Sequence, residues 1–220
     1  MPIIDIEKIY EWEKQEAIDT LKECGLDSGM TVIDFGCGLG HYTIPASIIS
    51  EEQGKIYAID SNKWIISEIE KRVSEYNIKN IFAVKADERS LSQYENSVNF
   101  IMYYDMFHAL KEKNKFIIDG FYSALSENGI LSFAVFNEIE LIQDPINGPK
   151  TPKGKPAWFR IPYEEALEHY KVIETIESSG FKLKSVVKEK CIHFDDYWQK
   201  KSNVSFSSLE RKDIYNFVKI

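Results

Sequence analysis

Three glycines stand within five positions in the stretch VIDFGCGLGHYT, residues 32–43, at Gly36, Gly38 and Gly40. Glycine loses more conformational freedom on folding than any other residue, so this concentration indicates that something must approach the backbone closely. When such a turn opens a helix, backbone N–H groups also point at an anionic part of a ligand. The chemistry that these residues indicate is the binding of a cofactor against bare main chain.

The spacing of the glycines distinguishes between cofactors. The dinucleotide fingerprint G-x-G-x-x-G would need a third glycine at position 41, where this chain has His41. Asp34 stands two residues before Gly36, which gives D-x-G-x-G-x-G. This pattern resembles the glycine loop of class I S-adenosylmethionine (SAM)-dependent methyltransferases. The resemblance extends from Leu21 to Phe136, and its overall pattern is most similar to the ubiquinone and menaquinone C-methyltransferases.

The resemblance implies a role for several acids. Asp60 would accept the two ribose hydroxyls of SAM, a task that suits the two oxygens of a carboxylate. Asp87 would bind the adenine amino group, Asp34 would brace the glycine loop and meet the methionine amine, and the backbone near Tyr103 would border the methionine end. The predicted cofactor-binding residues are Asp34, Gly36, Cys37, Gly38, Gly40, Asp60, Ser61, Asp87 and Tyr103. Structural alternatives stay open: Asp60 could cap the next helix, and Asp87 could only hold a turn.

Methyl transfer from a sulfonium needs little catalytic machinery, because holding the nucleophile in line is the main contribution. A general base is needed only if the attacked atom carries a proton. The candidates are Asp105 and His108, just beyond the strand at 98–104, although His108 could instead cap the next helix or pack against it. His193 lies near an aspartate pair but lacks a third ligand, so no metal site is predicted.

Short apolar runs alternate with helical periods, which predicts a parallel sheet with crossover helices. An N-terminal helix or helix pair should end at Gly25, and Asn62 should cap a later helix. The predicted strands are residues 31–35, 55–60, 81–85, 98–104, 130–136, 181–188 and 214–220. The predicted helices after the first strand are residues 41–50, the segment after Asn62, 111–125 and 162–180. The predicted fold is α/β: a doubly wound, Rossmann-like, seven-stranded sheet, mostly parallel with an antiparallel last strand.

We expect a single methyltransferase-like domain over residues 1–220, with an N-terminal helical segment at 1–26. Residues 137–162 are rich in proline and glycine and have no clear period. A loop of this length is uncommon in a compact domain, so it is either a lid or a surface insertion.

Composition narrows the function. The formal charge of −8 argues against nucleic acid as a partner, and no stretch is long and apolar enough to span a membrane. We expect a cytoplasmic enzyme that uses SAM to methylate a small molecule, of unknown oligomeric state. The alternatives are a non-catalytic SAM-binding sensor or partner subunit, and an NAD(P)-dependent oxidoreductase.

Overall fold

The structure is a computed structural model of the 220-residue chain. It describes residues 6–85, 88–106, 114–135, 139–142, 158–161, 171–192 and 211–220.

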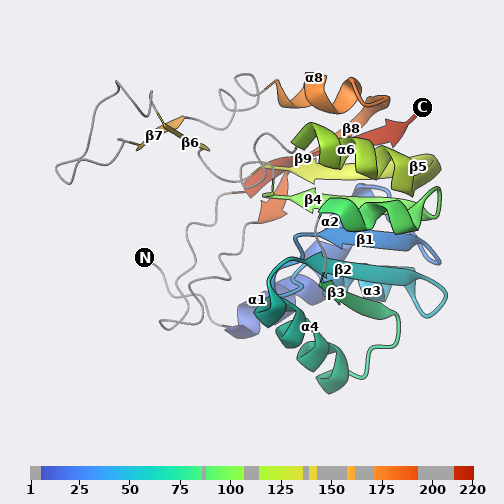
Figure 1. The fold of residues 1–220 in the computed structure, drawn as a ribbon. Helices are drawn as coiled ribbons and strands as arrows, with labels where there is room; N and C mark the ends of the chain where they lie inside the picture. The colour runs from blue at the N-terminus through green and yellow to red at the C-terminus, as the bar shows by residue number, and fades with distance from the viewer. Residues whose placement is uncertain are drawn as a thin grey trace.

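A seven-stranded sheet forms the centre of the molecule, in the order β3-β2-β1-β4-β5-β9-β8 (Figure 1). Its strands are β1 (Thr31–Phe35), β2 (Lys55–Asp60), β3 (Ile81–Lys85), β4 (Val98–Tyr104), β5 (Leu125–Ala134), β8 (Phe181–Ile192) and β9 (Arg211–Lys219). All neighbouring pairs from β3 to β5 are parallel, whereas β9 is antiparallel to both β5 and β8. This order and direction confirm the predicted fold class.

Helices cover both faces of the sheet. The described helices are α1 (Ile6–Lys14), α2 (Glu16–Glu23), α3 (Thr43–Ser50), α4 (Lys63–Glu75), η1 (Glu88–Tyr94), α6 (Asn114–Ala124) and α8 (Val172–Glu177). Leu21, Ile49 and Ile69, from α2, α3 and α4, belong to one buried cluster, while Leu91 and Ile117, from η1 and α6, belong to another. The two clusters lie on opposite faces, because the crossovers reverse direction after β3 and right-handed connections then change face.

The N-terminal segment is a helix pair, and its end shows why Gly25 was recognisable. Gly25 has a φ of 100°, its N–H bonds the carbonyl of Lys22 at 2.9 Å, and the N–H of Leu26 bonds the carbonyl of Leu21 at 3.0 Å. These two bonds form a Schellman motif, which favours glycine at the left-handed position.

Two element predictions are wrong. A single helix over 162–180 is excluded because Lys171 has a left-handed φ of 48°, and α8 begins only after it. The segment at 137–162 is not aperiodic throughout, since β6 (Ile139–Ile142) and β7 (Trp158–Ile161) pair as a two-stranded antiparallel sheet. The residues between these two strands lie outside the described part of the chain, so the prediction of a lid there is untested.

The boundaries of three strands also differ from those predicted. β5 begins at Leu125 and contains Asn128 with a φ of 61°, and its register with β4 is interrupted between Val98 and Phe100. β8 continues to Ile192 and β9 starts at Arg211. Asn128 and Gly129 therefore make an irregularity within β5, whereas the predicted strand began only after them, at residue 130.

Candidate functional site

The glycine loop connects β1 to α3 at the carboxyl ends of the parallel strands, where open α/β sheets bind ligands. Gly36, Gly38 and Gly40 have φ values of 81°, 51° and 82°, in the left-handed region that favours glycine. The N–H groups of Gly36 and Cys37 both bond the carbonyl of Ile59, at 2.8 and 3.1 Å. These bonds fasten the loop to the end of β2, so the two strand ends form one rim.

Two of the glycines also have close neighbours. A methyl group on Gly36 would collide with the thioether of Met106, and one on Gly40 would lie 2.6 Å from Cδ1 of Ile69. Met106 follows β4 and packs beside the core. Bare backbone at Gly36 is therefore already contacted by a flexible side chain of the protein, and a ligand that lies against this glycine must share or take that space.

Asp34 ends up buried at the base of the loop, with only 5% of its surface exposed. Its Oδ2 accepts a hydrogen bond of 2.5 Å from the hydroxyl of Thr43, the first residue of α3. Burial, followed by the nearby charge of Asp60, raises the pKa of Asp34 to about 7, while the hydrogen bond from Thr43 and the charge of His41 act in the opposite direction. The carboxyl thus ties both ends of the glycine loop together.

Asp60 lies at the last position of β2 and is partly exposed. Its Oδ1 accepts the N–H of Asn62 at 2.7 Å, and the side chain of Asn62 in turn accepts the N–H of Trp64 at 3.0 Å. Asn62 is therefore the helix cap, as predicted, and Asp60 stabilises this cap residue by accepting its backbone N–H. Ser61, between them, is exposed.

Tyr103 and Tyr104 point to opposite faces at the end of β4. The Tyr103 side chain is fully buried and donates its hydroxyl proton to Asn114 at 2.7 Å, and its burial raises its pKa well above the usual range. The Tyr104 hydroxyl lies 2.7 Å from that of Ser132. Both side chains are core residues, so only their backbone is available to a ligand.

The catalytic candidates are only partly described. Asp105 follows β4 with a left-handed φ of 54°, and its N–H bonds the carbonyl of Ala134 at 2.8 Å. This backbone conformation is uncommon outside glycine and is tolerated best by Asn and Asp. His108 and Asp87 lie outside the described residues.

Two arrangements near the loop were not anticipated. The buried Nδ1 of His41 lies 2.6 Å from Oε1 of Glu13, which also binds Arg72. The hydroxyl of Tyr42 bonds both the N–H and the carbonyl of Ile192, at 2.8 and 3.0 Å. Each contact joins residues far apart in the chain, and no local sequence pattern predicts such partners.

Within the described ranges, no group of three or more His, Cys, Asp or Glu side chains could hold a metal ion. Nor does this part of the chain contain a helix long and apolar enough to cross a membrane. The thiols of Cys24, Cys37 and Cys191 are buried and form no disulfide. A pocket of about 310 Å³ lies elsewhere, between α4 and β3, and includes Val73, Ile78 and Lys79 in its wall but none of the predicted site residues.

Comparison with known proteins decides the family. Residues 26–206 match a family model described as "Methyltransferase domain". The chain belongs to this methyltransferase family. Membership confirms the resemblance to class I SAM-dependent methyltransferases and SAM as the cofactor of the family.

Similar proteins support the same assignment for this methyltransferase domain. A probable cobalt-precorrin-6B C(15)-methyltransferase (decarboxylating) of Sulfurisphaera tokodaii is 27% identical over 38% of this chain and 44% of its own length. A demethylmenaquinone methyltransferase of Oceanobacillus iheyensis is 25% identical over 45% of the chain and 40% of its own length. The matches thus span less than half of these curated relatives.

A solved structure of a SAM-dependent methyltransferase from Aquifex aeolicus has the same fold. It matches with a TM-score of 0.67 and 22% identity, over 99% of this chain and 100% of that one.

Proposed function

We propose that this protein transfers the methyl group of SAM to a small-molecule acceptor. The observation that carries the proposal is the loop of three left-handed glycines fastened to the end of β2, beside the carboxyls of Asp34 and Asp60. Such a rim would offer main chain and two carboxyl groups to a ligand that carries an ammonium group and a ribose, provided that the ligand shares or takes the space of Met106 beside Gly36. The residues present therefore fit this cofactor.

The roles of the residues in this proposal follow from their chemistry. The glycine loop, with Cys37, cradles the methionine part, and Asp34 below it faces the amine. Asp60 accepts the ribose hydroxyls, with Ser61 beside it, and the backbone at Tyr103 borders the sulfur. Asp87 would bind the adenine amino group.

Bound there, the cofactor supplies a methyl group on a positively charged sulfur. The contribution of the protein is then to hold the acceptor atom in line and to exclude water, worth roughly 7–11 kcal/mol as effective molarity. Asp105, at the end of β4, accepts a proton when the acceptor atom carries one, with His108 as the second candidate base. For an acceptor without such a proton, neither residue is needed.

The small-molecule class of acceptor is supported by the relatives, whose names describe methylation of a precorrin and of a demethylmenaquinone. The net charge of −8 also favours a small acceptor over nucleic acid. A cytoplasmic location stays a prediction from the sequence.

Calorimetry with S-adenosylhomocysteine (SAH) and with NAD tests the cofactor, and a labelled methyl donor with a panel of small carbon, nitrogen and oxygen nucleophiles tests the reaction. SAH binding with transfer of label to a small acceptor is the expected result. Binding of NAD without SAH contradicts the proposal and favours the oxidoreductase. SAH binding without transfer to any acceptor favours the sensor or partner subunit.

A further inference from the structure

A buried ionic network joins the N-terminal helix to the glycine loop. Glu13, on α1, is only 3% exposed, and its Oε1 lies 2.6 Å from Nδ1 of His41. The same carboxylate accepts hydrogen bonds of 2.8 and 3.1 Å from Nη2 of Arg72, on α4. Nη1 of Arg72 donates to the backbone carbonyl of Leu39 at 2.5 Å.

The network contacts the loop once on each side of Gly40, at Leu39 and at His41. Arg72 donates a hydrogen bond to the carbonyl of the Leu39–Gly40 peptide, and the N–H of the same peptide donates to the carbonyl of Cys37 at 2.9 Å. Both ends of this peptide plane are therefore fixed. On the far side of Gly40, the ring of His41 is fixed by Glu13.

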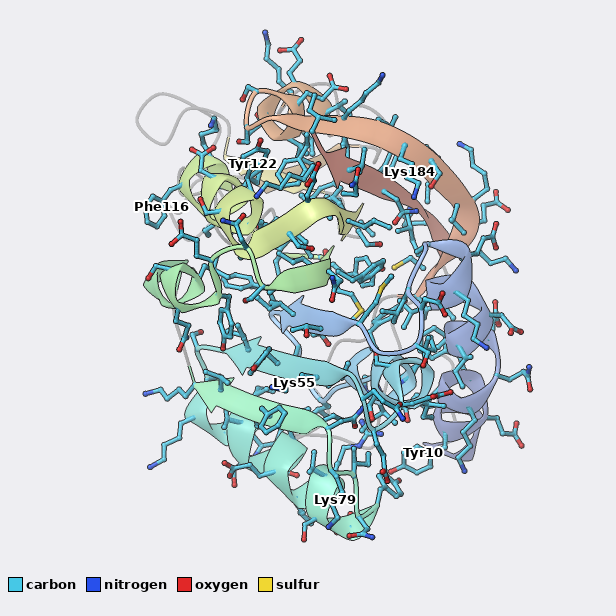
Figure 2. All side chains as sticks on the ribbon, turned by 90° about the vertical axis from the view of Figure 1, so that its right-hand side faces the viewer. Tyr10, Lys55, Lys79, Phe116, Tyr122 and Lys184 are labelled. Carbon is cyan, nitrogen blue, oxygen red and sulfur yellow. The ribbon has the colours of Figure 1, made fainter. Side chains whose placement is uncertain are left out.

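Aromatic rings surround the charged centre. The guanidinium carbon of Arg72 lies 5.8 Å from the ring centroid of Tyr10 and 5.9 Å from that of Tyr76. The two ring centroids lie 6.4 Å apart, with the rings edge to face. In Figure 2, Tyr10 and Lys79 both lie at the lower end of the molecule. Such rings stabilise a cation over their faces.

This arrangement is costly if its only purpose is to hold α1 in place. Burying a carboxylate and a guanidinium carries a large desolvation cost, and well-packed apolar residues often do as well. The Nε of Arg72 is buried without a hydrogen-bond partner within the described part of the chain, so the pairing is not optimal for stability alone. The two bonds made from this centre towards the loop reach residues 39 and 41.

We propose that Glu13 is a positioning residue for the cofactor loop, acting through His41 and Arg72. The inference rests on the proposed function, since the loop's task is taken to be the binding of SAM. Without the carboxylate, Arg72 loses the charged partner that orients it towards Leu39, and His41 loses its contact with Glu13. The network also affects Asp34 at the base of the loop, because the charge of His41 acts to lower the pKa of that carboxyl.

Glu13→Gln tests the inference, because glutamine keeps the size and one acceptor oxygen but removes the charge. The dissociation constant for SAH is measured by calorimetry and the melting temperature separately, on the full chain. Misplacing a binding group by about 1 Å can cost on the order of a hundredfold, so we expect the dissociation constant to rise roughly ten- to a hundredfold. Glu51→Gln is the matched control: it alters a carboxylate that accepts a bond from Ser28 away from the loop, and SAH binding should not change.

A second variant keeps the inference testable if Glu13→Gln does not fold. His41→Asn removes the ring but leaves the Glu13–Arg72 pair intact, and it should also weaken SAH binding. When both single variants fold, the double variant should bind SAH no more weakly than Glu13→Gln alone, because His41 acts through its contact with Glu13, which Glu13→Gln already alters.

The outcomes separate the two proposals. If the wild-type protein does not bind SAH, the proposed function fails. If the wild-type protein binds SAH and both variants bind it equally well, with only a lower melting temperature, the network is structural and the inference is overturned. If only His41→Asn folds, an unchanged SAH affinity in that variant overturns the inference.

Discussion

The hydroxyl of Thr43 donates a hydrogen bond of 2.5 Å to the buried carboxyl of Asp34, and so joins the end of β1 to the start of α3 across the glycine loop. The loop is also held by its backbone bonds to Ile59 and by the bond from Arg72 to the carbonyl of Leu39. This contact makes Asp34 a structural brace, while burial raises the pKa of the same carboxyl to about 7.

The raised pKa of Asp34 predicts an unusual dependence of stability on pH. The pKa is about 7 in the folded chain against an ordinary value of 3.8, so the unfolded chain gives up this proton more easily. The contribution of Asp34 to the free energy of unfolding is therefore largest below about pH 4 and is lost as the pH rises towards 7. Asp34→Asn, which stays neutral, should be more stable than wild type at pH 8, by about 2–4 kcal/mol, and nearly equal at pH 4.

Denaturant titrations of both proteins at pH 4, 6 and 8 check this. An Asp34→Asn variant that is less stable than wild type at pH 8 would show that the charged carboxylate stabilises the fold. SAH affinity of the same variant should fall, because the ionised carboxylate is the form that faces the amine in the proposed site.

Asp60 can be tested without disturbing the turn that follows it. Asp60→Asn keeps an oxygen for the N–H of Asn62 but loses one acceptor for the ribose, and we expect SAH binding to weaken by about 1.5–3 kcal/mol. Asn62→Ala provides the control, since it removes the helix cap at a cost of about 1 kcal/mol in stability but leaves Asp60 in place. Equal SAH affinities for Asp60→Asn and wild type would show that the ribose assignment is wrong.

The close approach of a ligand to Gly36 can be tested with Gly29 as a matched control. Both have a left-handed φ, of 81° and 75°, but only an added methyl on Gly36 meets another side chain, that of Met106. Alanine at either position should cost about 1–2 kcal/mol of stability through backbone strain. Only Gly36→Ala should also abolish SAH binding in calorimetry, because its methyl and the Met106 side chain that it meets compete for the space that the ligand needs. Loss of binding in both variants would point to backbone strain alone.

Tyr42 fastens the end of β8 beside the glycine loop. In Tyr42→Phe the N–H and carbonyl of Ile192 lose their partner in a buried position, which should lower the free energy of unfolding by about 1–3 kcal/mol. Hydrogen exchange should accelerate at the amide of Ile192 more than in the middle of β8. Uniform protection along β8 in the variant would mean that the strand end is held by other contacts.

The first four strands and the rim of the site could be predicted from local patterns. The ranges 31–35, 55–60, 81–85 and 98–104 agree with the structure because each is a short apolar run bounded by turn or helix signals. The position of the glycine loop and of Asp34 after β1 could be predicted from residue type and spacing within seven positions, and their role in binding stays a prediction.

What the sequence could not predict depends on distant partners. His41 and Arg72 lie 28 and 59 positions after Glu13, and only the fold brings the three residues together. The break at Lys171 was missed because the residue favours helices and its left-handed conformation has no local signal.

Strand β9 lies between β5 and β8, although it follows both in the chain. On the ribosome, the sheet must therefore remain open along one seam until residues 211–219 have been synthesised, with the edge of β5 exposed to other chains in the meantime. The final insertion closes this seam on both sides at once. A nascent chain stalled before residue 211 is thus expected to depend on chaperones far more than the finished protein does.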